Sequence, residues 1–277
     1  SEDIMNTTDD QLKNGDPIVS PSMPTTAWLT DPRVYAVHRL DAHSDHACWS
    51  HAPVNGEGSD LGQSLDGEWR VRVETAPTGR FPDGTSDVSP LFTASDFDDS
   101  SFSRVQVPSH LETAGLLAPQ YVNVQYPWDG HEDPEAPAIP EHGHVAVYRR
   151  EFDADGEVAQ AVREGRPVTL TFQGAATAIY VWLNGSFVGY AEDSFTPSEF
   201  DVTDAIKMEG NVLAVACYEY SSASWLEDQD FWRLHGLFRS VELNARPSAH
   251  VADIHADTDW DPATSRGSLS LDILVDG

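Results

Sequence analysis

The sequence predicts an all-β protein. From residue 28 onward, short runs of β-branched and aromatic residues recur between turn residues, which is typical of sandwiches built from many short strands. Residues 168–172 and 179–183 are two such runs, and Asn184-Gly185 after the second can take the positive φ of a type I′ turn. Residues 212–218 are apolar nearly throughout, as expected for a strand covered on both faces.

The other predicted strands are separated by long irregular segments. Residues 65–73 begin with a turn and continue as an alternating strand, with Trp69, Val71 and Val73 pointing inward. The remaining strands are predicted, in chain order, at 105–107, 145–152, 187–190, 240–243, 250–256 and 267–275. The irregular segments are a surface loop at 75–103 with a short helix around 86–92, a loop at 115–127, a proline-rich excursion at 128–140, a short helix at 157–164 and a turn at 257–264.

Composition limits the possible partners. Acidic residues outnumber basic residues by 46 to 16, which gives a formal net charge of −30. Such a surface keeps a protein soluble and repels nucleic acid and anionic membranes, so we expect neither as a partner. No apolar run of 18 residues occurs, and we expect no membrane-spanning helix. The first ten residues lack the basic and apolar regions of a signal peptide. We therefore expect a cytoplasmic protein, in which Cys217 is a reduced core thiol rather than the disulfide partner of Cys48.

Several motifs resemble the sugar-binding domain of family 2 glycoside hydrolases. They are Val-Trp-Leu-Asn-Gly at 181–185, Val-Gly-Tyr at 188–190 and Asp-Ser-Phe-Thr-Pro-Ser-Glu-Phe-Asp-Val at 193–202. Residues 225–239, Trp-Leu-Glu-Asp-Gln-Asp-Phe-Trp-Arg-Leu-His-Gly-Leu-Phe-Arg, are similar in particular to the large β-galactosidases. Stretches at 64–69, 107–110 and 121–127 extend the resemblance, so that it covers most of the chain from about residue 28.

The resemblance implies a domain order. Residues 28–246 would form a jelly-roll β-sandwich of the galactose-binding-domain type. After the break at Arg246-Pro247, residues 248–277 would form the first strands of an immunoglobulin-like sandwich. Residues 1–27 are polar and include three prolines, so we expect a flexible N-terminal tail.

The resemblance also implies an activity that this chain does not perform alone. Glycoside hydrolysis needs two carboxyl groups flanking the scissile bond, and in family 2 enzymes these glutamates lie in a TIM barrel. The chain lacks the alternating strands and helices of such a barrel, so we assign it no catalytic residue. We expect the inactive N-terminal domain of a β-galactosidase, a retaining enzyme that hydrolyses terminal β-D-galactosides such as lactose. The remaining domains of the same polypeptide would complete this enzyme, which is expected to be a homo-oligomer.

Two residues match positions that reach the sugar in the resembling enzymes. Asn123 matches a loop asparagine that hydrogen-bonds the substrate, and Asp193 matches an aspartate that contacts galactose and helps to bind sodium. The resemblance implies sodium and magnesium for the full enzyme, with no complete cofactor site in this chain. From the residues alone, the preferred interpretation is that Asn123 is a turn residue and Asp193 a loop-capping aspartate; the resemblance reverses this preference.

Three acidic residues near one another in the sequence, Glu227, Asp228 and Asp230, invite a catalytic interpretation. We favour a structural one, in which they bond Arg233, Arg239 or turn amides.

Three histidines, His38, His43 and His46, invite a zinc interpretation. Because no Cys/His pattern of metal-site spacing accompanies them, we predict hydrogen-bonded or exposed histidines.

Two other functions are compatible with the predicted fold. One is a free carbohydrate-binding module, which needs an exposed aromatic platform such as Trp128 or Trp225. The other is a structural or oligomerisation domain. Fold class alone does not separate these functions from the domain of a β-galactosidase.

Overall fold

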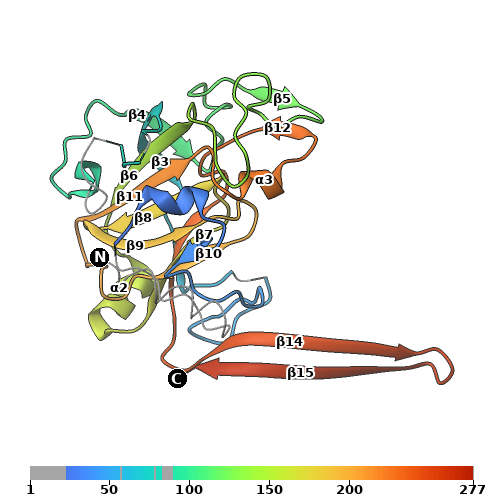
Figure 1. Ribbon diagram of the computed structural model, residues 1–277. Helices are drawn as coiled ribbons and strands as arrows, with labels where there is room; N and C mark the ends of the chain where they lie inside the picture. The colour runs from blue at the N-terminus through green and yellow to red at the C-terminus, as the bar shows by residue number, and fades with distance from the viewer. Residues whose placement is uncertain (1–22, 57, 78, 83–89, 277) are drawn as a thin grey trace, which may run out of the picture.

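The regular secondary structure of the chain is mainly antiparallel β-sheet (Figure 1). This computed structural model describes residues 23–56, 58–77, 79–82 and 90–276. Residues 1–22 of the tail predicted at 1–27 lie outside the described residues. Most of the helix predicted around 86–92 also lies outside them. Within the described ranges, the chain begins with a 3₁₀ helix, η1 (Thr26–Thr30). No helix of these ranges is long and apolar enough to cross a membrane.

Two antiparallel sheets form a sandwich. Over the described residues the larger sheet has seven strands, in the spatial order β1 (Ala36–Val37), β9 (Ser186–Ala191), β8 (Ala178–Leu183), β11 (Asn211–Tyr218), β6 (His144–Phe152), β3 (Gly67–Thr75) and β4 (Ser103–Val107). The smaller sheet has, in the same part of the chain, four strands in the order β10 (Ser198–Asp201), β7 (Val168–Phe172), β13 (Val241–Ala245) and β2 (Gly62–Ser64). The prediction of a mostly β sandwich is confirmed.

The central strand β11 is buried on both faces. From residue 213 onward its odd-numbered residues, such as Val215, belong to the core that also contains Leu170 of β7. From residue 214 onward its even-numbered residues, such as Ala216, belong to a second apolar cluster on the outer face of the larger sheet. All eight residues of β11 are buried, which confirms the prediction for 212–218. Cys217 is a buried free thiol, also as predicted.

Aromatic side chains from loops cover the outer face of the larger sheet. Trp28 of η1 stacks on Tyr180 of β8, with 5.8 Å between ring centroids. The segment at 75–103 adds three buried phenylalanines: Phe81, Phe92 and Phe102. The prediction of a plain surface loop at 75–103 is therefore wrong in part. Single phenylalanines anchor this segment, and no period reveals them among its Gly, Pro, Asp and Ser residues.

Two local predictions are confirmed. Asn184 and Gly185, which join β8 to β9, have φ of 55° and 82°, the positive values that a type I′ turn requires. The helix predicted at 157–164 is α2 (Gly156–Glu164), which ends at Gly165 with a left-handed φ of 67°. Two further short helices of the described residues are η2 (Leu91–Thr93) and α3 (Ser224–Glu227).

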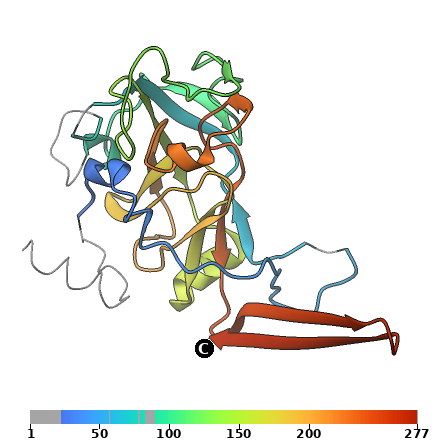
Figure 2. The same cartoon turned by 45° about the vertical axis from the view of Figure 1, so that its right-hand side comes forward.

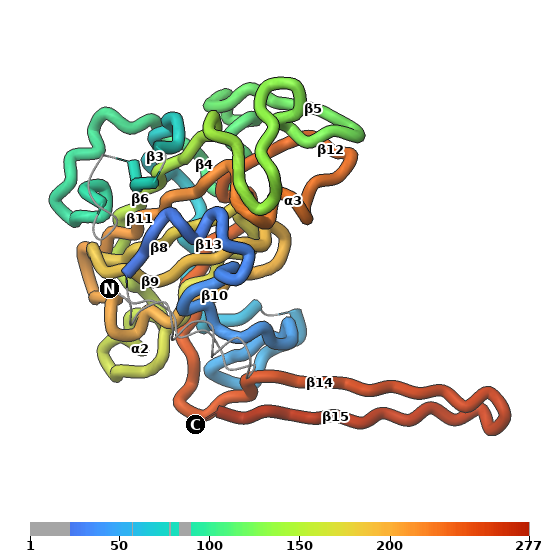
Figure 3. The backbone as a smooth tube through the Cα atoms, in the orientation of Figure 1, coloured from blue at the N-terminus to red at the C-terminus, as the bar shows by residue number. Residues whose placement is uncertain are grey.

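A short ribbon corrects the loop predicted at 115–127. Within that range, β5 (Gln120–Val122) pairs antiparallel with β12 (Phe231–Arg233), and Tyr121 lies opposite Trp232. A strand of three residues has no period to detect, and its partner lies in a distant part of the sequence. The ribbon lies beside α3 at one end of the sandwich (Figures 1 and 3).

A long hairpin stands away from the sandwich (Figure 2). Its strands are β14 (His250–Asp261) and β15 (Arg266–Asp276), which confirm the strands predicted at 250–256 and 267–275. The turn predicted at 257–264 is too long, because pairing continues as far as Asp261 and Arg266 and the turn is confined to residues 262–265. Both strands are exposed in this part, so no alternation of apolar and polar residues identifies them.

Candidate functional site

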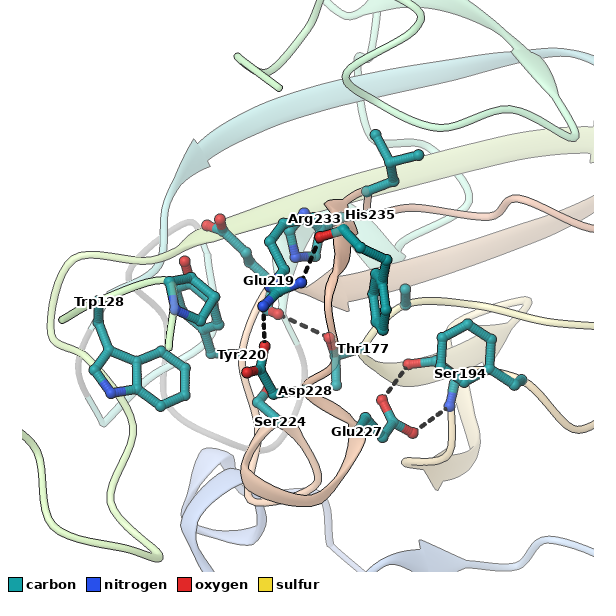
Figure 4. A pocket seen from close by; sticks show the side chains of 15 residues that line it. Trp128, Thr177, Ser194, Glu219, Tyr220, Ser224, Glu227, Asp228, Arg233 and His235 are labelled. Carbon is teal, nitrogen blue, oxygen red and sulfur yellow. Dashed lines mark hydrogen bonds and ion pairs between the residues drawn. The ribbon is translucent and has the colours of Figure 1, made fainter. Parts of the chain in front are cut away.

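Three segments that are far apart in the sequence meet beside α3. They are the loop after β9, residues 127–128 after β5, and the segment 219–235, and residues 176–177 before β8 lie beside them. They line a pocket (Figure 4) whose labelled residues are Trp128, Thr177, Ser194, Glu219, Tyr220, Ser224, Glu227, Asp228, Arg233 and His235. Its volume is about 60 Å³, whereas sites that enclose a small-molecule ligand measure roughly 300–1,000 Å³. This pocket, whose lining we call the pocket wall, is thus too small to enclose a ligand by itself.

Asp193 lies in the loop after β9, directly before Ser194 of this pocket. Its φ is 84°, a left-handed conformation that aspartate tolerates better than most residues. One carboxylate oxygen accepts from the N–H groups of Phe195 and Thr196, each at 3.3 Å, and the other accepts from the Thr196 hydroxyl. Asp193 therefore caps its own loop, as the interpretation from the residues alone predicted. It also lines a neighbouring hollow of about 550 Å³ with residues 39–43.

Asn123 is exposed and lies directly after β5. Its side-chain oxygen accepts from the N–H of Val124 at 2.9 Å, which is the local role of a turn residue. The segment 219–235 reaches both predicted residues through their neighbours: Arg233 donates to the carbonyl of Val122 at 3.3 Å, and Glu227 accepts from Ser194.

The three acidic residues of the candidate catalytic set each have a structural partner. Glu227 accepts from the N–H of Ser194 at 2.8 Å and from its hydroxyl at 2.6 Å. Burial raises the pKa of Glu227, the two bonds from Ser194 oppose this rise, and the charge of Asp193 adds to it. Glu227 thus bonds a turn amide, as we favoured.

The other two acids pair with different groups. Asp228 forms an ion pair with the buried Arg233, as favoured, and burial raises the pKa of Asp228. Asp230 accepts from the Tyr121 hydroxyl at 2.6 Å. This hydrogen bond crosses the ribbon formed by β5 and β12. Arg239 takes no part in this set, since it donates to backbone carbonyls, among them that of Phe195 at 2.6 Å.

The three histidines are hydrogen-bonded, as predicted. His38 contacts the carbonyl of Val188 at 3.2 Å, His43 contacts Glu199 at 2.6 Å, and His46 contacts the carbonyl of Val251 at 2.9 Å. Their partners lie on β9, β10 and β14, so the histidines serve separate contacts.

A sodium site would need oxygen ligands in addition to Asp193, because hard cations are surrounded by several oxygens. In the part of the chain that the structure describes, no three His, Cys, Asp or Glu side chains gather as a metal site. Both oxygens of Asp193 also accept hydrogen bonds from its own loop. The described side chains of these four types therefore gather no cation site around Asp193.

Sequence reasoning did not identify which aromatic residues are exposed. Trp128 is 4% exposed and stacks on Tyr126 at 5.0 Å between ring centroids, so its proposed role as an exposed platform is wrong. The indole of the half-buried Trp225 donates to the carbonyl of Ala138 at 2.8 Å. Among the exposed rings are Tyr121 and Trp232, which contact each other across the ribbon at 5.6 Å between ring centroids. A prediction of β5 and its pairing with β12 would have revealed this pair of rings.

Glu192 is a buried carboxyl that sequence reasoning also missed. It is 3% exposed and accepts from the hydroxyls of Tyr190 and Ser222 and from the N–H of Ala223. Burial raises the pKa of Glu192, although these hydrogen bonds lower it in part. Glu192 connects the end of β9 to the residues before α3.

Replacing Glu192 by glutamine is expected to remove a pH-dependent contribution to the free energy of unfolding. A carboxyl whose pKa is raised by folding stabilises the fold most below its unfolded pKa, and this contribution is lost as pH rises through the folded pKa. Urea unfolding between about pH 5 and about pH 8 should show the original chain losing stability relative to the variant as pH rises. A constant difference over this range would contradict the expectation.

Comparisons with known proteins agree on one family. Residues 62–247 match the family described as "Glycosyl hydrolases family 2, sugar binding domain". The chain is 54% identical over 262 residues to a β-galactosidase of Bifidobacterium adolescentis, with 91% of this chain and 24% of that protein covered. It is 52% identical over 250 residues to a β-galactosidase of Lactobacillus delbrueckii subsp. bulgaricus, with 90% and 23% covered. The chain thus spans about a quarter of the length of these curated relatives.

Solved structures share the fold at low sequence identity. A β-glucuronidase from Ruminococcus gnavus has a TM-score of 0.52 at 18% identity, and the match covers 78% of this chain and 34% of that chain. A β-glucuronidase from an uncultured Clostridium has a TM-score of 0.51 at 19% identity, with 82% and 35% covered. At such identities the likeness concerns the fold alone.

Proposed function

This chain belongs to glycosyl hydrolase family 2, whose sugar-binding domain it carries at 62–247, and we propose that it is the N-terminal, non-catalytic domain of a β-galactosidase. The enzyme would hydrolyse terminal β-D-galactosides such as lactose. The observation that carries the proposal is the identity of 54% over 91% of the chain to a β-galactosidase. Net charge supports it as well, because a chain with −30 charges repels an anionic glycoside but not a neutral galactoside.

The finer fold assignment is part of this proposal. The sandwich at 28–246 would be a jelly roll, and the hairpin at 248–277 would begin an immunoglobulin-like sandwich. The support is that β14 and β15 pair with each other and join neither sheet of the sandwich within the described residues. Their exposed apolar side chains, such as Leu269 and Ile273, would then be covered by other strands of that second sandwich.

The pocket wall suggests how the domain would bind a sugar. An ionised carboxylate has about four acceptor positions, and the loop of Asp193 uses three of them. The remaining position, on the oxygen that accepts from the Thr196 hydroxyl, can accept a hydrogen bond from a sugar hydroxyl. The exposed amide of Asn123 can donate through its nitrogen while its oxygen accepts from Val124. Both residues would form the rim of a galactose site that other domains complete.

The wall does not supply the chemistry of hydrolysis. A retaining enzyme needs a carboxylate nucleophile and a protonated acid about 5 Å apart on opposite sides of the glycosidic bond. Glu227, Asp228 and Asp230 are each engaged by Ser194, Arg233 or Tyr121. We propose that these acids hold the wall together and that the catalytic pair lies in another part of the polypeptide.

We expect the complete polypeptide to hydrolyse a chromogenic β-galactoside, and residues 1–277 alone to release no chromophore. The β-glucuronide with the same aglycone, which differs by its C6 carboxylate and by the configuration at C4, should be a poor substrate for the complete polypeptide. The test measures the rates of hydrolysis of both glycosides, and it measures the binding of galactose to the isolated chain by calorimetry. The proposal fails if the complete polypeptide prefers the glucuronide. It also fails if the isolated chain turns over the galactoside and Glu227→Gln abolishes this turnover.

A further inference from the structure

Glu227 ties the loop that carries Asp193 to α3. Its two carboxylate oxygens accept from the N–H and the hydroxyl of Ser194, at 2.8 and 2.6 Å, as the dashed lines in Figure 4 show. Ser194 is 1% exposed, so water cannot readily replace the carboxylate as acceptor. Loss of Glu227 would leave a buried N–H and a buried hydroxyl without their partner, which the loop can relieve only by moving.

The residue on the other side of Asp193 is anchored to the same segment. Glu192 accepts from the Ser222 hydroxyl at 3.0 Å and from the Ala223 N–H at 2.9 Å. Asp193 is therefore bracketed by two buried neighbours, Glu192 and Ser194, which are both held by residues 222–227. Between them, Asp193 is the half-buried residue whose carboxylate reaches the surface.

Asp193 depends on this bracket for its orientation. Its left-handed φ of 84° is a conformation that residues with a side chain disfavour. The two N–H groups that its carboxylate accepts from lie at 3.3 Å, longer than the usual 2.9–3.0 Å. Its third bond comes from the hydroxyl of Thr196 in the same loop, so these bonds fix the carboxylate to its loop but not the loop to the sandwich. The bonds from Ser194 to Glu227 are shorter, and one of them fixes the peptide unit that directly follows Asp193.

We propose that Glu227 is a positioning residue for galactoside binding: by holding Ser194, it keeps the Asp193 carboxylate aimed at the sugar hydroxyl. The inference rests on the function proposed above, in which Asp193 contacts the sugar. It assigns Glu227 a role distinct from acid–base chemistry. It also explains why a carboxylate is placed beside the like charge of Asp193, which is electrostatically unfavourable.

A double-mutant cycle in the complete β-galactosidase tests the inference. Glu227→Ala should lower kcat/KM about tenfold, mainly by raising KM, because a shift of a binding group by about 1 Å can cost even more. When Asp193 is already alanine, adding Glu227→Ala should change kcat/KM by less than about twofold, since coupled residues are not additive. Glu227→Gln keeps one acceptor oxygen and should restore part of the loss. Ser194→Ala, a milder change, should raise KM in the same direction.

Asp66 offers a matched control. Asp66 lies between β2 and β3, outside the pocket wall. Its carboxylate accepts from the Ser240 hydroxyl at 2.9 Å and from the Val241 N–H at 3.0 Å, so it accepts from one hydroxyl and one N–H, as Glu227 does. Asp66→Ala should lower the stability of the enzyme while leaving KM unchanged, because partial unfolding reduces the amount of active enzyme and therefore kcat alone.

Three results would overturn the inference. They are an unchanged KM in both Glu227→Ala and Ser194→Ala, a KM that rises equally in Asp66→Ala, and losses that add fully in the double variant. If Asp193→Ala lowers kcat/KM but the cycle shows no coupling, the positioning role alone fails. If Asp193→Ala has no effect, the proposed sugar contact of Asp193 fails, and the positioning role fails with it.

Discussion

Asp193→Ala in the complete β-galactosidase is expected to reduce transition-state stabilisation, measured as kcat/KM, by about 2–4 kcal/mol. The reason is that a charged acceptor bonded to a sugar hydroxyl can strengthen its bond as the oxocarbenium-like transition state forms. The variant loses this acceptor in a site from which bound substrate excludes water. Steady-state kinetics with a chromogenic galactoside measure the change.

One variant separates the sugar contact of Asp193 from its role as a loop cap, and a second compares it with the neutral contact of Asn123. Asp193→Asn keeps an oxygen that can accept from Phe195 and Thr196 but removes the charge, so it should keep the loop and still lose much of the activity. Asn123→Ala removes a neutral hydrogen bond and should cost about 1 kcal/mol. Equal kinetics of the original enzyme and Asp193→Asn would show that the charge has no part in sugar binding.

The strands could be predicted where the side chains themselves report burial. β11 is apolar along its length because both faces are covered, and Trp69 and Val71 of β3 are buried in alternation with the more exposed Arg70 and Arg72. β5 and the far half of the hairpin could not be predicted, because no buried face imposes a pattern on them. Exposed strands are defined by their backbone partners, which lie elsewhere in the chain.

The candidate site was predictable only in part for a similar reason. Motif resemblance pointed to Asn123 and Asp193. It did not reveal that Glu192 and Glu227 hold the residues around Asp193, because their partners lie 30 and 33 residues away in the sequence. A carboxylate that accepts from a distant N–H leaves no local signal. Such acids cannot be distinguished by sequence from the solvated acids that give the chain its charge.

The ion pair of Arg149 with Asp99 illustrates the same limit and gives the largest expected effect on stability. Arg149 lies on β6 with its side chain 2% exposed, and its Nε donates to the Asp99 carboxylate at 2.9 Å. Its guanidinium also donates to the carbonyls of Phe92 and Ala94. It thereby fastens the segment that covers the outer face of the larger sheet.

Asp99→Ala is expected to destabilise residues 1–277 by about 3–5 kcal/mol, because it leaves the buried Arg149 cation without a counter-charge. Urea unfolding followed by tryptophan fluorescence measures this change. Glu68→Ala is the matched control: it breaks the exposed pair with Arg104, whose side chains are 57% and 62% exposed, and should cost at most about 1 kcal/mol. Adding Arg149→Met to Asp99→Ala should recover part of the loss, since it removes the unpaired charge. If Asp99→Ala costs no more than Glu68→Ala, the Arg149 charge reaches water and does not fasten the covering segment.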